Sequence, residues 1–230
     1  MLIVTSVLLS GCMFPEEEKA GANIPYEDQL ADVQSAVEKF QADTGVLPIQ
    51  DRDMDTDLYI KYPIDFSKLV PKYLANPPSN SYEKGGIFQY VLWDPENNPT
   101  VKLVDLRSAE TIRDLNIRFT TTTYPTYKEP ITNYIYTIDF KKVGYKEDVT
   151  VPSPYTSNQL PLIVTTEGKV YVDYSMDLYQ YIKENNLKPK PGEDIRNLLV
   201  EAYPVLPAYS LPYTVDENNE PVFMYEPTKK

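Results

Sequence analysis

The clearest hydrophobic pattern in the chain is an amphipathic segment over residues 26–44. Its apolar residues recur at alternating spacings of four and three, which places them on one face of a helix. Pro25 and Gly45 flank the segment, as is typical of a first helical position and of the position after a helix end. The pattern predicts a helix whose apolar face needs a sheet or another helix to cover it: Tyr26, Leu30, Val33, Val37 and Phe40.

Short apolar runs bounded by turn residues follow, and they predict three hairpins. Their strands are expected at 86–93 with 100–106, at 160–166 with 169–174, and at 213–215 with 222–225. Periodic segments predict further helices at 66–74, 107–116, 175–186 and 193–203. The β-branched run Thr120 to Thr123 favours an extended segment over 116–124, and a second one is expected over 133–143.

This order of elements predicts an α+β fold. An N-terminal amphipathic helix would pack on an antiparallel hairpin or sheet, and a strand-rich module with two helices would follow. We expect the division between the modules near residue 107, giving 26–106 and 107–230. No long linker marks this boundary, so a single continuous domain is the alternative.

The chain opens with an apolar run that ends in Leu9-Ser10-Gly11-Cys12. The run is shorter than the ~20 apolar residues that span a bilayer, and it fits the core of a signal peptide. The four residues resemble the lipobox of bacterial lipoproteins. The resemblance implies that residues 1–11 are a cleaved signal peptide and that Cys12 carries a diacylglycerol with acyl chains such as palmitate. Residues 12–25, rich in glutamate and proline, would be a flexible spacer.

The lipobox resemblance implies a lipid-anchored location on the outer face of the bacterial cytoplasmic membrane. Two acyl chains give stable anchoring, since each buried CH2 contributes ~0.8 kcal/mol. Signal peptides normally begin with a basic residue, and none precedes Lys19, so the sequence leaves open whether the true start lies upstream of Met1 with a basic segment. The alternative interpretation is a buried apolar strand in which Cys12 is an ordinary core residue.

A second resemblance covers roughly residues 26–106. A helix ending in Gly-x-x-Pro, then Leu69-x-Pro71-x-Tyr73-Leu74, then Gly85-Gly86 before a hairpin is similar to the globular domain of type II secretion pseudopilins. A pseudopilin helix continues as an apolar segment that packs into a filament, whereas here a charged spacer takes that place. The resemblance therefore implies a fold and argues against filament assembly. As a whole, the chain also resembles lipoproteins of Gram-positive spore-forming bacteria, which implies no particular activity.

Charge and composition narrow the possible partners. The net charge is −12, so nucleic acid and anionic lipid headgroups are repelled on average. A basic partner, a divalent cation or a neutral glycan suits this surface better. The chain has no histidine, which excludes Ser-His-Asp catalysis and histidine metal sites, and its single cysteine leaves no disulfide framework. Tyrosines and prolines are unusually frequent, at 20 and 21.

Two stretches carry candidate sites. Asp51, Asp53, Asp55 and Asp57 alternate along the chain, a spacing that lets carboxylates converge on calcium. An EF-hand would need glycine at the sixth position and a carboxylate at the twelfth, where Thr56 and Tyr62 stand, so a solvated acidic loop is the alternative.

The second candidate is an aromatic platform for a glycan or peptide, formed by Trp93 with Tyr90. In a strand these two residues lie on opposite faces, and packing in the core and at the sheet edge is the alternative.

These observations lead to a functional hypothesis without catalytic residues. We expect a non-catalytic binding or interaction lipoprotein at the cell envelope, with an envelope protein or glycan as partner and no cofactor apart from possible calcium. One alternative is a carboxylate-based hydrolase of an envelope polymer, although among 34 acidic residues carboxylate pairs arise by chance and no spacing selects one. A solute-binding lipoprotein is the other, although no alternating strand–helix pattern supports it.

Overall fold

The computed structural model describes residues 27–122 and 125–227. The predicted signal peptide, Cys12 and the spacer lie outside these residues. The predicted N-terminal helix is confirmed as α1 (Glu27–Thr44), which buries Val33 and Val37 on its inner face. Gly45 follows with a positive φ of 76°, and its N–H donates to the Gln41 carbonyl at 2.8 Å. Glycine adopts this left-handed conformation without steric cost, so it ends the helix where the sequence predicts.

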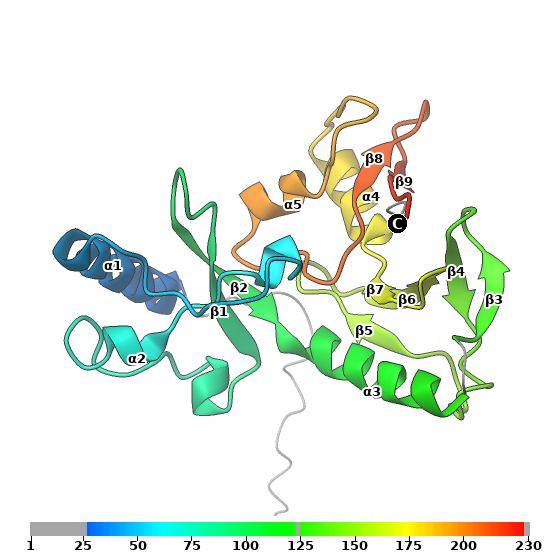
Figure 1. Cartoon of the computed structure of the whole chain (residues 1–230). Coiled ribbons are helices and arrows are strands. Elements are labelled where there is room, and N and C mark those ends of the chain that lie inside the picture. The colour runs from blue at the N-terminus through cyan, green and yellow to red at the C-terminus, as the bar shows by residue number, and fades with distance from the viewer. Residues whose placement is uncertain (1–26, 123–124, 228–230) are drawn as a thin grey trace, which may run out of the picture.

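The first predicted hairpin is also confirmed. Strand β1 (Phe88–Trp93) pairs antiparallel with β2 (Thr100–Asp105), from Phe88 opposite Asp105 to Trp93 opposite Thr100. Helix α1 contacts β2 and covers one face of the hairpin (Figure 1). Three short helices surround it: η1 (Leu58–Ile60), α2 (Phe66–Leu69) and η2 (Tyr82–Lys84). Helix α2 ends well before the predicted residue 74 because Pro71 cannot continue it.

The prediction of an extended segment over residues 116–124 is wrong for residues 116–122, and its last two residues lie outside the described part of the chain. Leu106–Thr122 form one continuous helix, α3, which buries Ile112, Leu115 and Phe119 at helical spacing. The threonines that favoured a strand donate their hydroxyls back to carbonyls one turn earlier, as Thr121 does to Arg118 at 2.7 Å. Packing of the apolar face outweighs the weak β propensity of the threonines.

A five-stranded antiparallel sheet follows, which confirms the α+β fold class. Its path is β3-β4-β6-β5, with β7 also paired to β6, and α3 packs against β5 and β7 (Figure 1). The strands are β3 (Tyr127–Pro130), β4 (Ile135–Ile138), β5 (Thr150–Pro152), β6 (Gln159–Thr165) and β7 (Val170–Val172). The prediction of extended chain over 133–143 is correct only for β4, because the chain turns after Ile138.

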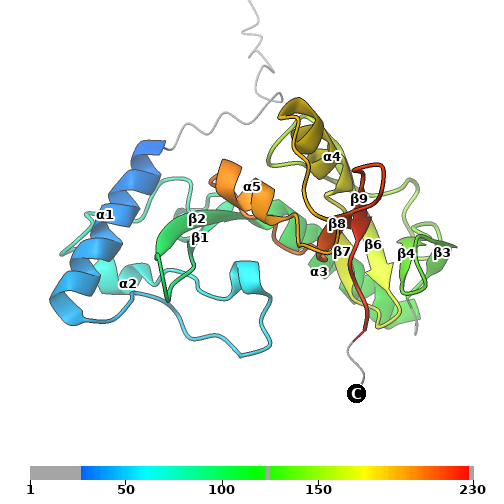
Figure 2. The ribbon, with the colours of Figure 1, turned by 90° about the horizontal axis from the view of Figure 1, so that it is seen from above.

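Two helices and a hairpin complete the chain: α4 (Ser175–Glu184), α5 (Asn197–Ala202), β8 (Tyr213–Val215) and β9 (Pro221–Phe223). Helix α5 is shorter than the predicted 193–203. Viewed from two directions, it lies between the β1–β2 hairpin and α4 (Figures 1 and 2). No helix in the described part of the chain is long and apolar enough to cross a membrane.

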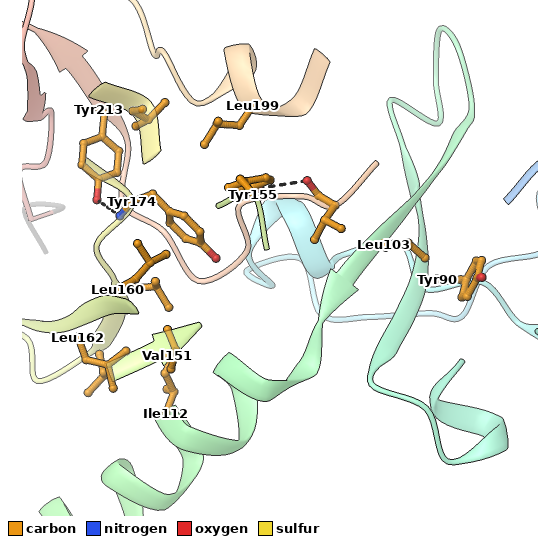
Figure 3. Packing of buried hydrophobic residues seen from close by; sticks show 14 of the residues in the cluster. Tyr90, Leu103, Ile112, Val151, Tyr155, Leu160, Leu162, Tyr174, Leu199 and Tyr213 are labelled. Atoms are coloured by element: carbon orange, nitrogen blue, oxygen red, sulfur yellow. Dashed lines mark hydrogen bonds between the residues drawn. The ribbon is translucent and has the colours of Figure 1, made fainter. Parts of the chain in front are cut away.

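Buried tyrosines join the C-terminal elements to the core (Figure 3). The Tyr155 hydroxyl donates to the Val205 carbonyl at 3.1 Å, and the Tyr174 hydroxyl donates to the Ala208 carbonyl at 3.2 Å. The Tyr213 hydroxyl accepts the Tyr174 N–H at 2.9 Å. Burial raises the pKa of Tyr155 and Tyr213 well above the ordinary value. These tyrosines therefore stay neutral, and Tyr155 and Tyr174 hold the 205–208 segment in place.

Candidate binding groove

The two faces of the β1–β2 hairpin separate the two predicted platform residues. Tyr90 is 1% exposed, packs edge-on against Phe66 and donates its hydroxyl to Asn80 Oδ1 at 2.8 Å. Trp93 is half-buried on the opposite face. The structure therefore does not bring the two aromatic rings together, and Trp93 alone reaches the surface groove described below.

Segments distant in sequence extend this hairpin on both edges. On the β1 side, Leu92 N donates to the Tyr62 carbonyl at 2.8 Å. On the β2 side, Leu103 N donates to the Pro204 carbonyl at 2.9 Å. Lys102 adds a second connection, because its ammonium donates to the Val200 and Tyr203 carbonyls, at 2.8 and 2.9 Å, at the end of α5. The β1–β2 hairpin and α5 are thereby held in a fixed relation.

Trp93 is held from behind by a stack of planar groups. Its ring lies 5.4 Å from the Tyr59 ring at an interplanar angle of 27°. The Arg196 guanidinium lies 5.0 Å from the centroid of the same Tyr59 ring. Tyr59 itself is 2% exposed, and burial raises its pKa to about 12. The neutral phenol and the cation over it give the indole a rigid support.

The Arg196 guanidinium is itself fixed by several partners. It forms a two-pronged ion pair with Asp194, with contacts of 3.0 and 2.6 Å to Asp194 Oδ2, and donates to the Ser210 carbonyl at 2.9 Å. Its side chain is 13% exposed and that of Asp194 is 29% exposed. Burial alone would lower the pKa of Arg196, but its hydrogen bonds to Asp194 and the nearby acidic groups outweigh this and raise it. The cation behind Tyr59 is therefore permanent.

A groove of about 350 Å³ opens over Trp93. It is lined by side chains from η1, the segment after it and the loop between β1 and β2: Leu58, Tyr62, Trp93, Asp94, Pro95 and Glu96. Asp94 has a φ of 47°, a left-handed conformation that aspartate tolerates better than most residues. Asn97 Nδ2 donates to Asp94 Oδ1 at 2.8 Å and orients this carboxylate. The groove thus combines a supported aromatic surface with carboxylates on one side.

Of the predicted calcium ligands, Asp57 directly precedes the groove residue Leu58. Asp57 Oδ1 accepts the Tyr59 N–H at 3.0 Å and caps η1, while Asp51, Asp53 and Asp55 are exposed. Burial raises the pKa of Asp57, and the bond from Tyr59 and the charge of Arg196 offset part of this rise. Over residues 27–122 and 125–227, no group of three or more acidic side chains is placed to hold a metal ion.

A second hollow, of about 430 Å³, lies along α3 and is lined by Ile112, Ile117 and Tyr209 among others. It is larger, and its lining also includes the polar side chains of Arg113, Asn116 and Thr120. The groove over Trp93 is the better candidate site because a buried aromatic ring supports its indole and two carboxylates lie beside it, as in binding pockets that orient a ligand.

Sequence reasoning identified Trp93 from its residue type but missed the residues that support it. Tyr59 follows a polar loop, and Arg196 lies far along the chain at the start of α5. No local periodicity connects such distant positions. The one available signal was Asp57, whose place before Leu58-Tyr59-Ile60 is typical of a helix cap.

Comparison with known families clarifies the first part of the chain. Residues 26–105 match the YphF family N-terminal domain. The match covers 80 of the 230 residues, so the likeness concerns this segment and not the whole chain. Every residue that lines the groove lies inside the matched range, whereas Arg196 and α5 lie outside it. No curated protein and no solved structure gives a significant match to the chain.

Proposed function

We propose that this protein is a lipoprotein held by Cys12 on the outer face of the bacterial cytoplasmic membrane, where its folded body binds an envelope partner without catalysis. The sequence Leu9-Ser10-Gly11-Cys12 supports the anchor. The likeness to lipoproteins of spore-forming bacteria supports the same location. The likeness of residues 26–106 to pseudopilins supports a similar fold only, and we do not propose filament assembly.

The groove over Trp93 is the observation that carries the binding role. The indole rests on Tyr59, and Tyr59 rests on Arg196, so the aromatic surface is in place before any ligand arrives. A preformed surface avoids the cost of ordering side chains on binding. Leu58, which is 55% exposed at the groove, adds apolar area.

The same geometry favours binding over hydrolysis. A carboxylate hydrolase needs two carboxyl groups facing each other across a substrate, at separations of about 5–10 Å. The groove carboxylates, Asp94 and Glu96, instead come from one loop beside Trp93 and not from two elements on opposite sides of the groove. This arrangement suits recognition of a ligand from one side.

Site-specific photocrosslinking in intact cells tests the binding role. A photoreactive residue replaces Leu58 at the groove or, as the control, Tyr82 on η2, which is 64% exposed and outside the groove lining. We expect a discrete envelope adduct from position 58, absent from position 82 and lost when Trp93→Ala is added. Identical adducts from both positions, or an adduct that survives Trp93→Ala, would contradict the proposal.

The anchoring role has a separate test. The Cys12→Ala variant should move from the membrane fraction to the soluble fraction, because it has no thiol to lipidate. A matched Ser10→Ala variant, which keeps the cysteine and a small residue, should stay membrane-bound. Membrane retention of the Cys12→Ala variant would refute the anchor.

A further inference from the structure

The ligand class follows from the charges around the groove. Its wall includes two carboxylates, Asp94 and Glu96, and neither forms an ion pair within residues 27–122 and 125–227. Their negative charge is therefore not neutralised locally. The protein as a whole carries a net charge of −12, which raises the local concentration of cations around it.

Trp93, which lines the groove, also favours a cationic ligand. The face of an indole attracts an ammonium or guanidinium group within about 6 Å of the ring centroid, more strongly than a phenol or phenyl face does. The chain already shows such a contact at the adjoining wall, where Lys61 Nζ lies 5.8 Å from the Tyr62 ring centroid. That ammonium also donates to the Met54 carbonyl at 3.1 Å.

The apolar part of the lining suits a long cationic side chain. Leu58 and Pro95 flank Trp93, and Met54, on the adjoining loop, is 91% exposed. Lysine and arginine pack their methylene stems along apolar surface while the charged head remains near polar groups. A volume of about 350 Å³ is in the range of sites that bind small molecules or peptide side chains.

We propose that the groove over Trp93 binds a basic peptide segment of an envelope protein, with a lysine or arginine side chain over the indole and its charge toward Asp94 and Glu96. This inference rests on the proposed binding function and names its ligand. A neutral glycan would also stack on Trp93, but the fixed carboxylate charges would add no charge–charge attraction for it.

Trp93 is the only tryptophan in the chain, so its fluorescence reports on the groove directly. The experiment titrates full-length protein with tetralysine, with the same peptide acetylated on every lysine side chain, and with a tetramer of N-acetylglucosamine. We expect tetralysine to change the Trp93 emission in a saturable way and the two uncharged probes to leave it unchanged. The affinity should fall as salt rises, because ions screen exposed charges.

Charge variants separate specific binding from attraction to an acidic surface. The Asp94→Asn/Glu96→Gln variant keeps the indole and should bind tetralysine roughly tenfold more weakly. The control, Glu147→Gln/Asp148→Asn, removes the same charge from an exposed turn between β4 and β5 and should bind as the wild type does. Equal weakening in both variants would overturn the inference.

The other outcomes are equally decisive. A response to acetylated peptide equal to that with tetralysine, or no response to any probe, would refute recognition of a basic side chain. A response to the sugar alone would also refute it while leaving the proposed binding role intact. Loss of the groove-specific crosslink from position 58 would instead overturn the proposed function itself.

Discussion

Replacing Arg196 with methionine tests whether the ion pair behind Tyr59 supports the groove. Methionine keeps much of the side-chain volume but removes the charge, the fork to Asp194 and the bond to the Ser210 carbonyl. Removing one partner of a buried pair costs about 3–5 kcal/mol, because the other charge stays buried. Asp194 is 29% exposed, which lowers this cost, while the lost contact with Tyr59 adds about 0.5–1 kcal/mol. We expect a loss of about 3 kcal/mol in the free energy of unfolding.

Urea unfolding followed by circular dichroism measures this loss, and Trp93 emission follows the groove in the same samples. For a chain of 230 residues, 3 kcal/mol corresponds to a decrease in Tm of about 6–12 °C. The Arg113→Met variant is the control. The Arg113 side chain is 70% exposed, and its Nε lies 3.9 Å from Asp114 Oδ1 in a weak, solvated ion pair. It should unfold almost as the wild type does.

A double variant isolates the cause of the effect. Adding Asp194→Asn to Arg196→Met removes the negative charge of Asp194, which the single variant leaves unpaired. The amide oxygen of the new asparagine can still accept hydrogen bonds from the N–H groups that bond to Asp194. The double variant should recover at least 1 kcal/mol relative to Arg196→Met. If Arg196→Met costs no more than Arg113→Met, or if the double variant recovers nothing, then the ion pair does not stabilise the structure as argued.

Three further predictions concern the rest of the fold. Lys102→Met removes two charge-assisted hydrogen bonds to the end of α5. It also removes a charge whose burial lowers the pKa of Lys102, and this relief offsets part of the loss. We expect a net loss of about 2 kcal/mol in the free energy of unfolding measured with urea, and a loss below about 0.5 kcal/mol would contradict this role. Burial raises the pKa of Asp177 above its ordinary value of 3.8, although hydrogen bonds from Thr156 and Ser153 oppose the rise. As pH increases, this carboxyl therefore ionises in the unfolded chain before it ionises in the folded protein, and Asp177 lowers the free energy of unfolding. Asp177→Asn should therefore gain stability relative to wild type between about pH 3 and pH 6, whereas a pH-independent difference would show that this carboxyl does not titrate as described. Gly86→Ala should cost more than about 3 kcal/mol, because its Cβ would overlap the Asn80 carbonyl oxygen. Gly192→Ala, whose Cβ would meet nothing within 4 Å, should cost about 1 kcal/mol, and equal Tm values for the two variants would refute the comparison.

Local patterns were sufficient to predict the first helix and the hairpins. In α1 the apolar spacing, Pro25 and Gly45 all indicate the same element, and in β6–β7 two apolar runs flank the turn at Gly168. Helix α3 was missed in its second half because Thr120 to Thr122 favour strands locally, while burial of Phe119 decides the outcome. The prediction of extended chain over residues 139–143, after β4, was wrong for a similar reason, since Phe140 and Val143 are buried from a turn rather than from a strand.

The groove was only partly predictable. Trp93 stands out by residue type, and strand alternation already placed Tyr90 on the other face. The support from Tyr59 and Arg196 depends on how η1, β1 and α5 pack together, which no local pattern in one sequence contains. In the acidic stretch from Asp51 to Asp57 the fold uses Asp57 as a helix cap, and calcium binding by the alternating aspartates stays a prediction.

The most direct test of an anchored binding lipoprotein is the intact mass of the protein extracted from its native membrane. The account predicts a chain that begins at Cys12 and carries the added mass of a diacylglyceryl group with its acyl chains. Such a mass would place the groove over Trp93 outside the cytoplasmic membrane, where envelope proteins can reach it. An unmodified chain that still begins at Met1 would contradict the anchor and, with it, the proposed location.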